Sequence, residues 1–203
     1  MKLYFNALSS NSRRARAVVH HLGLKVEEVS VDFTDLRKEL LKLNPNAKIP
    51  VLVDGDFALW ESNAIMQYLC EKSGDTTLWP RDLKARADIT KWQFWVASHL
   101  GPSVAMVNME RVFKKRFRPD AAPDESIIRY GLDNWNRFAA VLDQHVQSRQ
   151  WLVGSAPTLA DYAVAAPLMY MTIAELPTDP YPNLVSWTGR VAELPGWTKT
   201  AMA

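Results

Sequence analysis

The stretch that decides the fold spans residues 44–74 and reads NPNAKIPVLVDGDFALWESNAIMQYLCEKSG. Its pattern predicts a short strand, a tight Asp-Gly turn, a second strand and a helix that begins at Ser62. Pro50 stands at the entry of the first strand, where an X-Pro bond can be cis and the proline has no N–H for a ladder. The backbone of Ile49 is therefore left to pair with an extended, peptide-like ligand.

The start of the predicted helix offers a second contact for such a ligand. Glu61 and Ser62 lie where a helix N-terminus presents free N–H groups and a positive dipole end, which favours a carboxylate. A peptide backbone docked at residue 49 with its carboxylate at residue 62 describes glutathione, held through its cysteinyl and γ-glutamyl parts.

The same segment resembles the glutathione-binding half of cytosolic glutathione transferases. Their pattern runs N-P-x-x-x-(I/V)-P, then a D-G turn, then (F/W)-E-S-x-A-I-x-x-Y-L, and nearly every position is filled here. The resemblance covers essentially the whole chain and is sharper in its first third. It implies that glutathione binds through the backbone of Ile49, cis Pro50, Glu61 and Ser62.

The order of predicted elements favours an α/β domain followed by an all-α domain. The first part has the βαβαββα order of the thioredoxin-like fold, with a right-handed crossover between its first two, parallel strands. We expect strands or helices over 2–5, 12–22, 26–31, 35–43, 51–53, 57–60 and 62–72. The expected domains are residues 1–77, a linker over 78–84, and a helical domain over 85–203.

The helical domain is predicted from apolar spacings near 3.6. Helices are expected over 85–101 and 103–117, with Pro102 kinking or dividing them, and over 125–150. Thr158 and Asp161 have the spacing of a capping box, and the resemblance places that box at a buried helix. We therefore assign Asp161 to folding and not to chemistry.

Serines gather before the first helix, where a thiolate could be stabilised. The thiolate of glutathione is the nucleophile, and a hydroxyl that donates to the sulfur at a helix N-terminus stabilises it. The resemblance to serine-type members, such as the phi and theta classes, favours Ser9, because it stands four residues before Arg13. Ser10 and Asn11 remain alternatives. Tyr4, the rival from tyrosine-type classes, fits that register poorly and is interpreted as a strand residue.

Two further sets of residues are candidates for contacts with the substrates. For the glycine carboxylate of glutathione, Lys48 is the better candidate and Arg37 the weaker. The resemblance implies that a small apolar electrophile binds where the helical domain faces the sulfur. One face of the helices expected there carries Trp95, His99, Met106 and Met109, a set suited to binding an apolar electrophile. The same spacing is also expected of side chains that pack in the core of the domain.

Composition narrows the remaining possibilities. The 203 residues carry a net charge of +2 with mixed signs, so no nucleic-acid partner is expected. Cys70 is the single cysteine and is interpreted as a buried hydrophobe, and the histidines lack ligand spacing, so we expect no metal. Without a signal peptide or a long apolar run, we expect no membrane contact and a reducing, cytoplasmic location.

Three functions stay open at this point. The first is transfer of glutathione to electrophiles, the second is glutathione-dependent reduction of disulfides or peroxides, and the third is a non-catalytic binding module. The resemblance also implies a two-fold homodimer. The residues expected on its contact surface are Met66, Gln67, Lys72, Arg86, Asp88 and Lys91.

Overall fold

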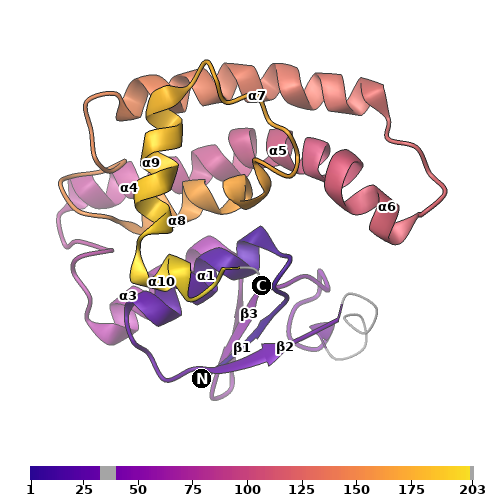
Figure 1. The fold of residues 1–203 in the computed structure, drawn as a ribbon. Helices are drawn as coiled ribbons and strands as arrows, with labels where there is room; N and C mark the ends of the chain where they lie inside the picture. Colours follow the sequence, from indigo (N-terminus) through magenta and orange to yellow (C-terminus); the bar gives the residue numbers. More distant parts are fainter. Residues whose placement is uncertain (33–39, 202–203) are drawn as a thin grey trace. The chain divides into compact units, whose positions relative to one another are not determined.

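A computed structural model describes residues 1–32 and 40–201 of the chain. The chain divides into two compact units (Figure 1). The N-terminal unit consists of residues 1–82 and 191–203, and the helical unit consists of residues 83–190.

The N-terminal unit is built on a four-stranded mixed sheet in the order β2-β1-β3-β4. Strand β1 runs parallel to β2, and β3 runs antiparallel to β1 and β4. These pairings confirm the predicted parallel pair, the hairpin and the thioredoxin-like fold. The strands are β1 (Lys2–Phe5), β2 (Glu27–Ser30), β3 (Val51–Asp54) and β4 (Phe57–Trp60).

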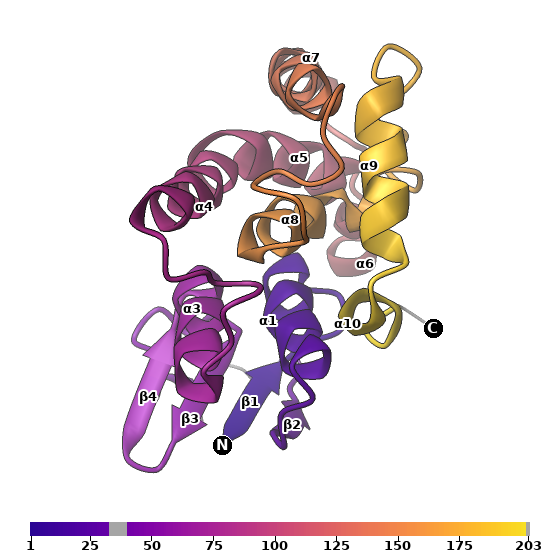
Figure 2. The same ribbon diagram turned by 90° about the vertical axis from the view of Figure 1, so that its left-hand side faces the viewer.

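Both faces of this sheet carry buried apolar side chains. Leu3 and Leu52 are paired in register and fully buried. They share the face of Phe5, whose ring lies under the guanidinium of Arg16 in α1 (Ser10–His21). Helix α3 (Ser62–Ser73) packs against α1 and against β3 and β4, as Figure 2 shows.

The opposite face of the sheet is covered by the chain that precedes β3. Leu40 and Val51 are fully buried there, and Tyr4 packs against them. The helix expected over 35–43 falls mostly on residues 33–39, which lie outside the described residues. Arg37, one of the candidates for the glycine carboxylate, lies outside them as well.

The end of the chain returns to the N-terminal unit. Helix α9 (Pro182–Ala192) leads into the short α10 (Pro195–Thr198), which packs on α1 (Figure 2). The boundaries predicted from the sequence place every residue after 84 in the helical domain, whereas the described residues 191–201 belong to the N-terminal unit. The physical reason is a close backbone approach, since a Cβ on Gly196 would lie 2.0 Å from the carbonyl oxygen of Ala17.

The helical unit opens with one long helical run that covers both predicted helical segments, so Pro102 does not divide it. Two π-helical turns interrupt it, and Pro102 follows the first of them at the start of α5. Proline has no N–H to donate, so the hydrogen-bond pattern is irregular there, as expected. The segments are α4 (Leu83–Trp95), η1 (Val96–Leu100), α5 (Gly101–Asn108), η2 (Met109–Phe113) and α6 (Lys114–Phe117).

Helix α7 (Glu125–Val146) packs against α5. The two helices approach closely at Gly131, where a Cβ would lie 2.7 Å from Cγ2 of Val107. The prediction extended α7 to residue 150, but the helix ends at Val146. Beyond it, the carbonyl groups of Arg149 and Gln150 accept hydrogen bonds from the Arg190 side chain.

The predicted capping box begins α8 (Leu159–Ala165), which is followed by the 3-10 helix η3 (Ala166–Tyr170). The Asp161 carboxylate accepts from the backbone N–H of Thr158 at 2.8 Å, of Leu152 at 2.9 Å, and from the Trp187 indole at 3.0 Å. Asp161 is fully buried and joins three segments of the helical unit. The predicted capping box is therefore confirmed.

Candidate functional site

Ser9 is the residue that begins the first helix. It is the N-cap of α1, and its Oγ accepts a hydrogen bond from the backbone N–H of Ser12 at 3.2 Å. The hydroxyl uses a lone pair in this contact, so its own O–H remains able to donate to another acceptor. Ser9 is half-buried. The hydroxyl proton of Ser9 therefore lies at the positive end of the α1 dipole, where it can be donated to an anion.

Asn6 fixes the loop that carries Ser9, and sequence reasoning missed it. Its Oδ1 accepts from the N–H of Leu8 at 2.9 Å, and its Nδ2 donates to the carbonyl of Val31 at 2.8 Å. The N–H of Ser9 in turn donates to the Asn6 carbonyl at 3.0 Å. An Asn at the end of a strand and three residues before a cap was the available local signal.

The two alternatives to Ser9 lie in the first turn of the same helix. Ser10 is half-buried and Asn11 is exposed. The structure therefore brings Ser9, Ser10 and Asn11 together at one helix end. Tyr4 behaves as the strand residue that was predicted, since its side chain packs on the sheet face away from Phe5 and α1.

The loop before β3 is held in shape by Asn44. The Asn44 side chain donates to the carbonyl of Lys48 at 2.7 Å and accepts from the N–H of Asn46 at 3.0 Å. The peptide bond between Ile49 and Pro50 is cis, which confirms the prediction. Pairing of β3 begins at the next residue, so Ile49 precedes the ladder, and Lys48 beside it is exposed.

The junction between β4 and α3 has an unusual backbone. Glu61, the N-cap of α3, has φ 71° and ψ 108°, and its side chain makes no capping hydrogen bond. A non-glycine residue in such a conformation costs about 1–3 kcal/mol, and such strain is concentrated at functional sites. Ser62 follows at the first position of the helix and is 6% exposed.

A buried cation connects the first and third helices. Nη1 of Arg14 donates to Oδ1 of Asn63 at 3.2 Å, which ties α1 to the first turn of α3. Arg14 is 5% exposed, and its Nε has no hydrogen-bond partner among the described residues. Burial lowers the pKa of Arg14 to about 10, and the nearby Glu61 carboxylate partly opposes that shift. Arg14 is therefore charged at neutral pH.

Together these features make the N-terminal unit suited to an anionic, peptide-like ligand. The starts of two helices, the cis proline loop and a buried arginine belong to one compact unit. Helix N-termini and guanidinium groups both favour carboxylates and thiolates. Sequence reasoning missed Arg14 and Asn63, because their contact joins residues that are far apart in the chain.

The four residues of the expected substrate stripe occupy different surroundings within the helical unit. The rings of Trp95 and His99 lie 6.1 Å and 5.3 Å from that of Phe138 in α7. Met106 faces α7 near Gly131, whereas Met109 is 49% exposed. Each π-helical turn adds a residue to the run, which rotates later side chains by about 100° relative to a regular α-helix.

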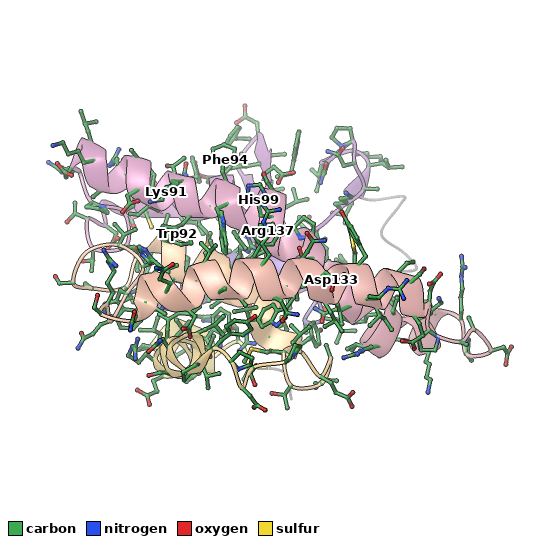
Figure 3. All side chains as sticks on the ribbon, turned by 90° about the horizontal axis from the view of Figure 1, so that it is seen from above. Lys91, Trp92, Phe94, His99, Asp133 and Arg137 are labelled. Carbon is green, nitrogen blue, oxygen red and sulfur yellow. The ribbon has the colours of Figure 1, made fainter. Side chains whose placement is uncertain are left out.

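A pocket of about 550 Å³ lies within the helical unit, between α4 and α7. Trp95 lines it, and so does Trp92, whose ring lies 4.6 Å from that of His145. In Figure 3, Trp92 and His99 lie toward α7, whereas Phe94 points away from it. The complete lining consists of Lys91, Trp92, Trp95, Val141, Gln144, His145 and Arg149.

The described residues also bear on Cys70, on metal binding and on membrane insertion. Cys70 is buried, and this burial raises the pKa of its thiol well above the usual range. A buried, neutral thiol agrees with the interpretation of Cys70 as a small hydrophobic residue. Within residues 1–32 and 40–201, no cluster of three His, Cys, Asp or Glu side chains could hold a metal ion. In the same residues, no helix is long and apolar enough to cross a membrane.

Comparisons with known proteins find one family. The model for the glutathione S-transferase N-terminal domain matches residues 1–71, and that for the C-terminal domain matches residues 105–195. Glutathione S-transferase 3 of Zea mays is 33% identical over 100% of this chain and 94% of its own. The probable glutathione S-transferase GSTF2 of Oryza sativa subsp. japonica is 29% identical over 99% of this chain and 95% of its own.

A solved structure agrees with these relatives. The crystal structure of a glutathione S-transferase from Sinorhizobium meliloti 1021 superposes with a TM-score of 0.85. It is 29% identical in sequence and covers 98% of this chain and 90% of its own.

Proposed function

This chain belongs to the glutathione S-transferase family and is a glutathione transferase, and we propose that it joins the glutathione thiolate to small apolar electrophiles. The observation that carries the proposal is the pairing, in one compact unit, of a serine-capped helix with a second helix start beside a cis proline. The start of α1 at Ser9 favours a thiolate, and the start of α3 favours a carboxylate.

Glutathione binding follows from the chemistry of these groups. The γ-glutamyl carboxylate meets the first turn of α3 at Glu61 and Ser62, beside the charge of Arg14. The cysteinyl backbone pairs with the backbone of Ile49, as a strand would extend the sheet. Lys48 is exposed beside it and is the candidate for the glycine carboxylate.

The reaction requires the thiolate form of glutathione. The thiol loses its proton to solvent, and the sulfur anion then accepts a hydrogen bond from the Ser9 hydroxyl at the N-terminus of α1. Ser10 or Asn11 could donate from the same turn. The thiolate attacks the electrophilic carbon, a carbon–sulfur bond forms, and the leaving group departs with the electron pair of the broken bond.

A kinetic panel tests the proposal. The purified enzyme is assayed with glutathione and, in turn, an aromatic halide, an organic hydroperoxide and a mixed disulfide. Turnover of the halide with release of halide ion is the expected result. Turnover of only the hydroperoxide or the disulfide would instead favour glutathione-dependent reduction. Glutathione binding without turnover of any of these substrates would favour a binding module.

A further inference from the structure

The described residues 191–201 belong to the N-terminal unit, although they follow the helical unit in sequence. Helix α10 packs along α1 (Figure 2). Its Trp197 is 7% exposed, and the Arg13 guanidinium lies 4.1 Å from the centre of the indole ring. A cation held over an aromatic face is a directional contact.

The contacts of α10 follow one face of α1. They fall on Arg13, Ala17 and His21, which are four residues apart and so lie above one another on a helix. The approach is tight, because a Cβ on Gly196 would lie 2.0 Å from the Ala17 carbonyl oxygen and 3.0 Å from the His21 nitrogen. Contacts over two turns of one face fix how a helix is rotated about its own axis.

The rotation of α1 decides where the Ser9 hydroxyl points. The N–H of Arg13 donates to the Ser9 carbonyl at 2.9 Å, and the Ser9 cap bonds the N–H of Ser12. The residue that stacks on Trp197 is thus one turn away from the cap and hydrogen-bonded to it. A change at Trp197 would be transmitted to Ser9 through this single turn.

We propose that Trp197 is a positioning residue for the thiolate site, which acts by holding Arg13 and the first turn of α1 in the orientation that aims the Ser9 hydroxyl. The proposal rests on the proposed function, because it takes the start of α1 as the site of the glutathione sulfur. It assigns to the last helix of the chain a role in the reaction and not in stability alone.

The test is the pKa of the glutathione thiol in the complex, followed by the near-ultraviolet absorbance of the thiolate. Trp197→Leu removes the aromatic face and is expected to raise this pKa by roughly half a unit to one unit. Trp197→Phe keeps an aromatic face and is expected to recover at least half of that shift. The acid limb of the pH profile of kcat/KM should move with the thiol pKa, and the rate should recover at high pH.

Leu69→Ala is the control for a general loss of packing. Leu69 is fully buried in α3 of the same unit, so its variant should lower Tm and leave the thiol pKa unchanged. The inference is overturned if Trp197→Leu lowers Tm without moving the thiol pKa, or if Leu69→Ala moves it equally. If the wild-type enzyme itself does not lower the pKa of bound glutathione, the proposed function fails first and the inference fails with it.

Discussion

At the scale of single residues, the start of α3 combines a strained residue, Glu61, with a nearby buried charge, Arg14. Glu61 keeps a positive φ that a glycine would adopt more easily, and Arg14 keeps a charge that burial disfavours. Glu61 is the N-cap of α3, and Arg14 reaches from α1 to Asn63 in the first turn of α3. A bound carboxylate at Ser62 would explain why both are present.

The first prediction concerns that carboxylate. Ser62→Ala removes a charge-assisted hydrogen bond, typically about 1.5–3 kcal/mol, so the Kd for glutathione should rise roughly ten- to 150-fold. Isothermal titration calorimetry measures it. Ser73→Ala, at the other end of the same helix, is the matched control and should bind as the wild type does. Equal affinities for the two variants would remove Ser62 from the site.

A second prediction concerns Asn6, which the sequence did not single out. Asn6→Ala removes the side-chain bonds to the backbone of Leu8 and Val31, so the loop before Ser9 loosens. We expect kcat to fall, and the affinity for glutathione to change little, because the contacts proposed for its carboxylate lie on α3. Steady-state kinetics with varied glutathione separates the two effects. A rise in KM with an unchanged kcat would contradict this role.

At the scale of elements, Glu110 links the long helical run to the start of α7. Its carboxylate accepts from the Lys114 ammonium at 2.6 Å and from the backbone N–H of Asp124 at 2.7 Å. These two contacts hold the pKa of Glu110 below its usual value of 4.5. A lowered acid pKa means that the folded state favours the ionised form, which stabilises the fold above pH 4.5.

The third prediction follows from the lowered pKa of Glu110. Glu110→Gln should lower Tm at pH 7, and the difference from the wild type should shrink as the pH falls below 4.5, through the lower pKa of the folded state. Thermal unfolding followed by circular dichroism over this pH range measures it. Glu125→Gln, which changes an exposed residue in the first turn of α7, serves as the control. A pH-independent difference would show that the contact is not ionic.

Elements specified by neighbouring residues were predicted well from the sequence. The hairpin before α3, the cis bond at Pro50 and the capping box of Thr158 and Asp161 each depend on a few adjacent residues. The π-helical turns were not predicted. Each of them inserts one extra residue into the helix, and an apolar spacing that averages about 3.6 residues does not reveal such an insertion.

Contacts between distant residues account for most of what the sequence did not predict. Gly196 packs on Ala17, and Arg14 bonds Asn63, across separations for which no local pattern is available. The candidate site was therefore predicted in its local parts, which are the serines at the first helix, the proline loop and the start of α3, although that helix begins at Ser10 and not at residue 12. Its supporting residues, Asn6 and Arg14, became visible only with the fold.

At the scale of the whole molecule, the expected contact surface for a homodimer needs one correction. Met66 was expected to be exposed, but it is fully buried, because it lies on the α3 face with Ile65 and Leu69 that turns inward. Lys72 and Lys91 are exposed, and Lys91 forms an ion pair with Asp88 on the surface of α4. Lys72 is likewise paired with Asp54, so these exposed charges lie at the surface as ion pairs.

The fourth prediction is the homodimer itself. Light scattering at micromolar concentration should give about twice the 23.0 kDa of the chain. Lys91→Glu places a second negative charge beside Asp88 and should shift the mass toward that of the monomer. Lys115→Glu, on an exposed position of α6, should not shift it. A wild-type mass of one chain would exclude the dimer.

The central claim is that the serine-capped start of α1 stabilises the glutathione thiolate. A spectroscopic titration of the thiolate in the glutathione complex tests it most directly, with Ser9→Ala and Tyr4→Phe compared with the wild type. We expect Ser9→Ala to raise the thiol pKa and lower turnover at neutral pH, while Tyr4→Phe leaves both nearly intact. The opposite pattern, with the pKa shift lost in Tyr4→Phe and kept in Ser9→Ala, would contradict the account.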